Sequence, residues 1–199
     1  MFEHNYDKKS GFTLAEILVS LGIIGVVAAM TIPTLMMNYQ KKIWEAKLKK
    51  TYSIATNACE RMLIEENVSA VNETALYGAT TDDERKEEVR KYFKVMQDGA
   101  TVTGRGYSIL LPDSAILYIT GTNNGFEFYT DVNGLEGKPN TPGRDEFEFR
   151  LDKDCAYDSN IGQNASDAAK GFKYVVEHNW QIPENYPAAA PSPEPSVAP

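Results

Sequence analysis

The stretch "GFTLAEILVSLGIIGVVAAMTIPTLMM", residues 11–37, decides the fold of this chain, because it opens a long apolar helix. From Ile17 to Met37 the sequence contains no Asp, Glu, Lys or Arg. About 21 residues of α-helix extend about 30 Å, the thickness of the hydrocarbon core of a bilayer, so we expect the segment to enter a membrane. Glu16 stands directly before it, where a charged side chain is costly unless it is paired.

Hydropathy alone leaves Glu16 unexplained. A cleavable secretory signal would have a shorter apolar region followed by a small-x-small site, but this segment ends in "VVAAMTIPTLMM" without an A-x-A site. An ordinary single-pass anchor would explain the length, yet neither Glu16 nor the junction between Gly11 and Phe12. Lysines lie on both sides of the segment, so counting them does not fix its orientation.

The residues at this junction carry a resemblance. Gly11, Phe12, Thr13, Leu14 and Glu16, followed by the apolar stretch, resemble the processing motif of type IV pilins and of the pseudopilins of type II secretion systems. In that family a prepilin peptidase cuts after the glycine on the cytoplasmic side and N-methylates the new first residue. The resemblance implies that Gly11 precedes the cut and that Phe12 becomes the methylated N-terminus. It also implies that Glu16 meets the amine of a neighbouring subunit during assembly.

The resemblance further implies partners and a location. The partners would be the chain itself in a filament homopolymer, prepilin peptidase, other pseudopilins and the inner-membrane assembly platform. The chain would pass once through the bacterial inner membrane, with its globular domain exported to the periplasm or the cell exterior, and would join a surface filament after assembly. Pro33 lies where a stem proline of this family is associated with local melting, although a tolerated membrane-helix proline is the alternative.

The helix is predicted to continue beyond the membrane to about Glu66. Its apolar side chains recur at steps of three and four residues, as expected of a stem with one buried stripe, at Trp44, Leu48, Tyr52, Ala55, Cys59 and Met62. We therefore divide the chain into a cleaved leader (1–11), a transmembrane and polymerisation helix (12–40), an amphipathic stem (41–66), a globular domain (67–183) and a disordered tail rich in Pro and Ala (184–199).

The globular domain reads as a sheet with two short helices. A capping box from Thr81 to Glu84 opens a helix that should bury Val89, Phe93 and Met96 on one face, and Ser166 should cap a last helix. Four runs rich in aromatic and β-branched residues, with turn residues between them, predict strands at 107–111, 115–120, 126–132 and 146–151. The expected fold is α+β and pilin-like, with the long N-terminal helix packed on a four-stranded antiparallel sheet.

The loop between the last two predicted strands is a candidate cation site. Asp131, Asn133 and Asp145 supply oxygen ligands, and Gly134 and Gly143 allow backbone carbonyls to turn inward, as a hard cation such as calcium requires. In placement and chemistry the loop resembles the calcium loop of major pseudopilins. Its spacing is not that of an EF-hand, and the Asn-Gly pair by itself is typical of a plain turn.

Cysteine content leaves two readings open. Cys59 and Cys155 could pair in an exported domain and close a loop of about 95 residues, or both could remain free thiols. A cysteine or histidine metal cluster is not expected, because the sequence has no CxxC motif and no histidine pair. Calcium is thus the one candidate cofactor.

Composition narrows the function classes. The chain has 199 residues and a net charge of −8, and no basic patch with interleaved aromatic residues, which argues against nucleic acid as a partner. It lacks GxSxG, HExxH and P-loop motifs, and removal of the leader would leave His178 as the one histidine, so an enzyme is not expected. We predict a structural filament subunit of a type II secretion pseudopilus or a type IV pilus. The alternative is a minor tip subunit that binds a substrate or a surface.

Overall fold

The computed structural model describes residues 11–134, 140–160 and 165–183, so leader residues 1–10 and the tail at 184–199 lie outside the described residues. The chain divides into two compact units, residues 1–41 and residues 42–199. Helix α1 (Leu14–Glu65) contributes to both units. Each unit is described by itself below.

The first unit contains the apolar part of α1. Among the described residues, α1 is the one helix long and apolar enough to cross a membrane. Its aliphatic side chains are exposed on all sides, and Phe12 just before it is 83% exposed. Such a surface is stable in hydrocarbon and unfavourable in water, which agrees with the predicted transmembrane helix. The helix continues through Pro33.

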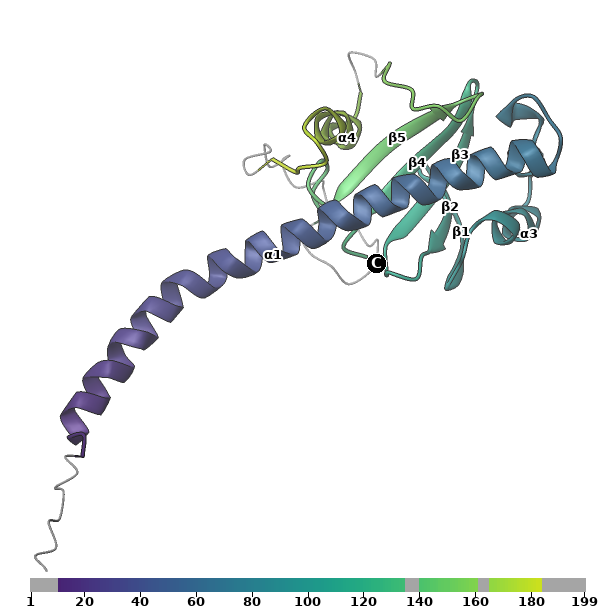
Figure 1. Ribbon diagram of the computed structural model, residues 1–199. Coiled ribbons are helices and arrows are strands. Elements are labelled where there is room, and N and C mark those ends of the chain that lie inside the picture. The colour runs from purple at the N-terminus through teal and green to yellow at the C-terminus, as the bar shows by residue number, and fades with distance from the viewer. Residues whose placement is uncertain (1–10, 135–139, 161–164, 184–199) are drawn as a thin grey trace, which may run out of the picture. The chain divides into compact units, whose positions relative to one another are not determined.

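The second unit is built on the remainder of α1. The predicted stripe is confirmed, because α1 buries Leu48, Ala55, Cys59 and Met62 at helical spacing, while Trp44 and Tyr52 are partly buried against the same core. This part of α1 crosses one face of an antiparallel sheet (Figure 1). The sheet has the order β1-β2-β3-β4-β5, formed by Gln97–Val102, Gly106–Leu110, Ile116–Thr122, Gly125–Asp131 and Glu146–Asp152.

Alternation along the strands creates the core face of the sheet. The register aligns one buried row across four strands, Tyr107, Ile119, Phe128 and Phe149. Tyr52 of α1 packs on this row, with its ring centroid 5.4 Å from that of Phe149. The long helix laid on an antiparallel sheet confirms the predicted α+β class.

The predicted number of strands is wrong by one, because the sheet has five strands and not four. The additional strand, β1, has the sequence "QDGATV" and is largely exposed, so it shows no alternation between apolar and polar residues. It is held by backbone pairing with β2, which is interrupted by a bulge between Asp98 and Thr101. Arg90 also bonds Asp98, and the Thr101 N–H donates to Asp82 at 3.0 Å.

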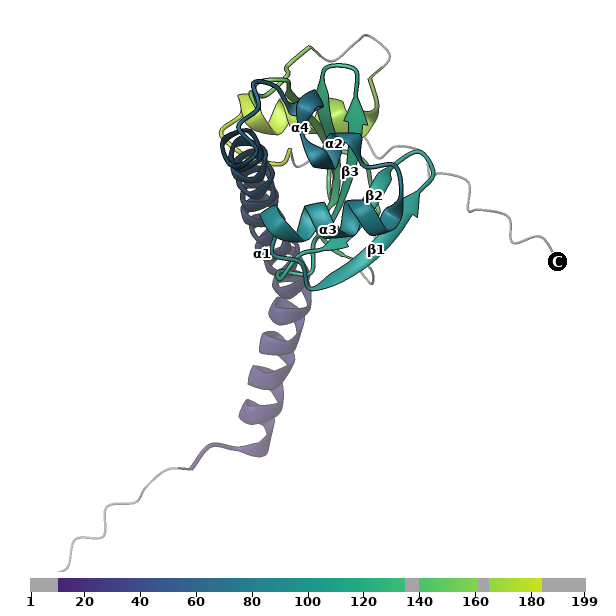
Figure 2. The same cartoon turned by 90° about the vertical axis from the view of Figure 1, so that its right-hand side faces the viewer.

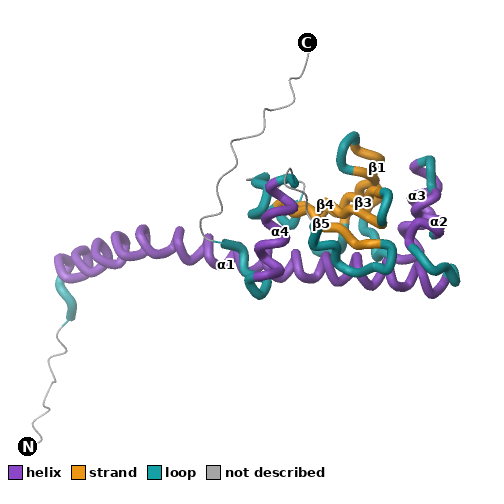
Figure 3. The backbone as a smooth tube through the Cα atoms, turned by 90° about the horizontal axis from the view of Figure 1, so that it is seen from above, coloured by secondary structure: helices purple, strands orange, loops and turns teal. Residues whose placement is uncertain are grey.

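Short helices flank the sheet at its two sides. The segment η1 (Val71–Glu73) and α2 (Ala75–Gly78) lead into α3 (Asp82–Tyr92), and α3 lies beside β1 (Figure 2). Helix α4 (Asp167–Glu177) packs on β5, over a different part of α1 from the α2–α3 pair (Figure 3). The capping box from Thr81 to Glu84 and the Ser166 cap are both present as predicted.

One predicted core residue is wrong. Val89 and Phe93 are buried, but Met96 is 67% exposed. Helix α3 ends at Tyr92, and Phe93 already has extended backbone angles, so the helical spacing that would bring Met96 onto the same face no longer applies.

Candidate functional site

Thr13 and Glu16 form a capping box at the start of α1. The Thr13 N–H and hydroxyl donate to Oε2 of Glu16 at 2.8 and 2.9 Å, and the Glu16 N–H donates to the Thr13 hydroxyl at 3.3 Å. Free N–H groups at a helix start normally bond to water, and this cap satisfies two of them, those of Thr13 and Glu16, within the chain itself. Within the described residues, Oε1 of Glu16 accepts no hydrogen bond, so one oxygen stays open to a donor from outside the chain.

Sequence reasoning missed the role of Thr13. Its signal was readable, because Thr-Leu-Ala-Glu has the S/T-x-x-E spacing of a capping box directly before an apolar run. Gly11 and Phe12 precede this cap. A Cβ atom at Gly11 would have no described atom within 4 Å, so the packing of the described chain does not require a glycine there.

The structure brings together the three predicted loop residues. Asp131 ends β4, and its Oδ1 accepts the N–H groups of Asn133 and Gly134 at 3.1 and 3.0 Å. The Asn133 amide donates to Oδ2 of Asp145 at 2.5 Å, and the Thr141 N–H donates to the other oxygen at 2.7 Å. Because β4 and β5 pair directly, the two ends of the loop that joins them lie side by side at the end of the hairpin.

Three buried carboxyl groups meet at this loop. Asp131, Asp145 and Glu146 are each at most 4% exposed. Burial raises the pKa of Asp145 to about 7, and the neighbouring carboxylates Asp131 and Glu146 act in the same direction. Burial also raises the pKa of Asp131. Arg105 reaches Glu146 at 3.4 Å as a compensating charge.

Glu146 was missed as a member of this cluster, because the sequence placed it in a strand with no hint of its burial. Carboxylate, amide and backbone oxygens are the donor chemistry that calcium takes, so the residues fit that ion in kind. In the described ranges, however, no group of three or more His, Cys, Asp and Glu side chains lies in a metal-holding arrangement. The Asp131 and Asp145 oxygens carry the hydrogen bonds given above, which an ion would have to replace.

Two neighbouring elements hold the loop. The Lys47 ammonium of α1 donates to the carbonyl oxygen of Val132 at 3.1 Å. In the sequence, Val132 stands between the candidate ligands Asp131 and Asn133. On the other side, Gly143 lies against Gly171 of α4 so closely that a Cβ on Gly171 would be 2.3 Å from the Gly143 Cα. Gly143 itself has φ +80°, a backbone angle that residue types other than glycine rarely adopt.

Replacing Gly171 with alanine is expected to lower the free energy of unfolding by about 1–3 kcal/mol, because the added methyl meets backbone atoms that cannot rotate away. Urea denaturation of a fragment beginning at Lys42 measures this change. Gly78→Ala is the matched control, because a Cβ there has nothing within 4 Å, and its stability should stay within about 1 kcal/mol of wild type. Equal stability of the two variants would contradict the close contact.

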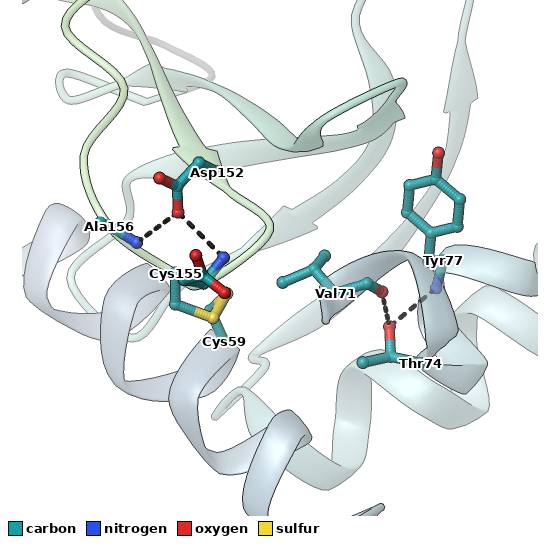
Figure 4. The surroundings of a disulfide bond; sticks show 8 residues. Cys59, Val71, Thr74, Tyr77, Asp152, Cys155 and Ala156 are labelled. Carbon is teal, nitrogen blue, oxygen red and sulfur yellow. Dashed lines mark hydrogen bonds between the residues drawn. A yellow bond between two sulfur atoms is a disulfide. The ribbon is translucent and has the colours of Figure 1, made fainter. Parts of the chain in front are cut away.

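Cys59 and Cys155 are joined in a disulfide, with their Cα atoms 5.7 Å apart (Figure 4). Cys155 has φ +63° in a turn after β5, and Asp152 holds that turn by accepting the N–H groups of Asp154 and Ala156, each at 2.9 Å. The bond therefore ties the end of the sheet to the buried stripe of α1.

Comparison with known proteins adds one finding. Residues 6–32 match the family model described as "Prokaryotic N-terminal methylation motif". The matched range contains Gly11, Phe12, Thr13 and Glu16 and stops before Pro33. No curated protein and no solved structure matches the chain.

Proposed function

We propose that this chain, which carries the N-terminal methylation motif that marks type IV pilins and pseudopilins, is a prepilin. Its mature form would polymerise. The filament would be a type II secretion pseudopilus or a type IV pilus. The motif indicates a structural subunit rather than an enzyme, and together with the apolar first part of α1 it fits a protein anchored in the inner membrane.

The geometry at Glu16 carries the assembly step of this proposal. Cleavage after Gly11 would leave a positively charged amine on Phe12, in the same apolar layer as the carboxylate. Oε2 of Glu16 is used by Thr13 of its own chain, whereas Oε1 has no partner among the described residues. An amine from a neighbouring subunit could therefore bond Oε1 while the cap stays intact. In a low dielectric a correct pair stabilises both charges, and a wrong register leaves both stranded.

The exposed part of α1 supports polymerisation through this helix. No described part of the chain covers its apolar side chains. They could pack equally well against lipid tails or against the same helix of neighbouring subunits. Abundance separates a building block from a tip subunit. A building block should be among the most plentiful proteins in sheared surface fractions, whereas a tip subunit should be scarce.

Mass spectrometry of the mature protein is expected to show a chain that begins at N-methylated Phe12. The Gly11→Val variant should accumulate as uncleaved precursor, because prepilin peptidases need a small residue directly before the cleavage site. Gly22→Val is the matched control in the same apolar segment, also with free space around its Cα, and it should be cleaved normally. An intact leader on the wild-type protein, in a strain with active prepilin peptidase, would overturn the proposal.

A second proposal concerns the loop, where Asp131, Asn133 and Asp145 would hold calcium, with Glu146 close by. A bound divalent cation would neutralise the buried carboxylates and favour their ionised forms. The support is the shared burial of the acids and the raised pKa of Asp145. A plain hydrogen-bonded turn is the competing reading.

If the loop binds calcium, adding it to the chelated fragment should raise the melting temperature, by an amount that grows with the ratio of calcium to its dissociation constant. Without calcium, the folded state holds a proton on Asp145 up to about pH 7, whereas the unfolded state loses it near pH 3.8. Stability should therefore fall as pH rises between these values, and calcium should remove that fall.

Asp131→Ala should abolish the calcium response. Asp154→Ala is its control, because that carboxylate lies outside the cluster and is exposed beside Lys153. Identical melting of wild type with calcium and with chelator, at pH 7.5, would leave the plain turn as the correct reading.

A further inference from the structure

Basic side chains gather on α1 shortly after its apolar part. Between residues 42 and 50 the helix carries four lysines and a single acid, which are Lys42, Lys47, Lys49 and Lys50, and Glu45. Residues 67–199 hold 12 basic and 21 acidic side chains, so this short segment is an exception on an acidic chain. The pairing proposed for Glu16 makes no use of these lysines.

Two of the four lysines have no acidic partner. Lys42 and Lys49 are exposed and form no ion pair with a described residue. Lys50 pairs with Asp113 at 2.9 Å, although its side chain is still 54% exposed. Like charges this close in the chain repel one another, so an anion from outside the protein would stabilise the segment.

A fifth positive charge comes from a distant part of the chain. The guanidinium of Arg144, just before β5, lies 5.8 Å from the centre of the Trp44 ring on α1. Lys47 donates to the carbonyl oxygen of Val132 and not to a carboxylate, so its charge is not neutralised there. We call the five residues the basic collar: Lys42, Lys47, Lys49, Lys50 and Arg144.

The collar follows the side of α1 that the globular domain leaves open. Helical steps of about 100° per residue spread its four lysines over about 160° of the circumference. The middle of this arc is roughly opposite Leu48, which is buried in the core, and Arg144 beside Trp44 extends the charge further around. Lipid headgroups surround a helix on every open side, whereas a protein or nucleic acid partner contacts one face. The spread of the charge therefore favours headgroups.

The position of the collar in the sequence suits the same partner. Along the helix, Lys42 follows Met37, the end of the charge-free run, by about 8 Å, and Lys50 follows it by about 20 Å. The headgroup layer is about 5–8 Å thick on each side of the hydrocarbon core, and its field extends about 8 Å further at physiological salt. Long lysine side chains can extend back toward this layer.

We propose that the basic collar binds the anionic headgroups of phospholipids such as phosphatidylglycerol, at the surface of the membrane that α1 enters. Bound headgroups would gather anionic lipid around each monomer and fix the depth of α1 in the bilayer. Headgroup binding requires α1 to enter a membrane, but it requires neither cleavage, polymerisation nor calcium. It can therefore fail or hold independently of those steps.

Lysine acetylation of the full-length protein in nanodiscs tests this binding. Compared with discs of phosphatidylcholine alone, discs that also contain phosphatidylglycerol should slow acetylation of Lys42 and Lys49 about fivefold, the effect of about 1 kcal/mol for a basic residue near an anionic surface. Mass spectrometry reads the rates, and high salt should remove the difference. Lys153, exposed on the globular domain, is the internal control and should react equally in both discs.

Equal rates at Lys42 and Lys49 in the two kinds of disc would overturn the proposal. So would an equal slowing at Lys153, because the effect would then not belong to the collar. Inorganic phosphate added to discs of phosphatidylcholine alone should leave both rates unchanged. Protection by phosphate would also overturn the proposal, because the site would then take a free anion.

A pair of double variants provides a second measurement. Lys42→Gln with Lys49→Gln should retain at least about fivefold less phosphatidylglycerol than wild type when the protein is extracted from these discs in mild detergent. Lys86→Gln with Lys91→Gln is the matched control, because it removes two positive charges on α3, outside the collar, and should retain as much as wild type. Equal retention by the two double variants would contradict the collar.

Discussion

Glu16→Gln is expected to be inserted, cleaved and methylated, and to form no filaments. Glutamine keeps an oxygen that can accept the Thr13 N–H, so the capping box and the helix start should survive. It lacks the negative charge, so the amine of an incoming subunit would stay unpaired in the apolar layer, which is costly. Processed monomer should collect in the inner membrane, as measured by fractionation and by counting filaments in electron micrographs.

Two variants separate the charge from the cap. Glu16→Ala removes both and should fail in the same way, whereas Thr13→Ala keeps the carboxylate and removes the hydroxyl, so it should still assemble, although less efficiently. Wild-type protein expressed alongside Glu16→Gln should rescue filaments only partly, because the pairing joins different subunits. Filaments of normal number and length from Glu16→Gln would show that the charge has another purpose.

Removal of the disulfide has the second large expected effect. The double variant Cys59→Ala with Cys155→Ala should lose about 4–5 kcal/mol in its free energy of unfolding, because the bond closes residues 96 apart in sequence and restricts the unfolded chain. Both cysteines are nearly fully buried, and alanine leaves small cavities that add to the loss. Urea denaturation of the fragment beginning at Lys42 measures the change.

Reduced wild-type protein provides the control for this variant. With a reductant present, its unfolding midpoint should move most of the way to that of the double variant, and the midpoint of the double variant should not change. Cys59→Ala alone should resemble the double variant, since one remaining thiol cannot restore the bond. An unchanged midpoint in wild type, with both thiols shown to be free by alkylation, would contradict a stabilising disulfide.

Much of the fold was predictable from periodicity. The buried stripe of α1 and the four strands β2–β5 follow from helical spacing and from alternation, because each of these elements buries one face. β1 was not predictable in this way. Its side chains are exposed, and its position depends on backbone pairing with β2, on the bond that Arg90 donates to Asp98 and on the bond that the Thr101 N–H donates to Asp82, none of which leaves an apolar pattern in the sequence.

The candidate sites were predictable in part. Asp131 and Asp145 come together because they flank paired strands, which the sequence indicated. The raised pKa of Asp145 depends on burial and on Glu146, which no local pattern reveals. The pairing of Cys59 with Cys155 stayed open at the sequence level, because it depends on how the turn after β5 packs on α1 across a long separation in the chain.

The two edges of the sheet have a consequence for the proposed assembly, which would bring many copies of the chain together. On the β1 side, the Thr101 N–H is taken by Asp82. On the β5 side, the Asp152 N–H donates to Ala156 and the Arg150 carbonyl accepts from Asp158, so the chain after β5 covers that edge itself. Exposed strand edges are the usual starting points for cross-β aggregation. With those backbone groups occupied, neighbouring copies have fewer ways to pair strand to strand at the sheet edges, and aggregation should compete less with ordered association.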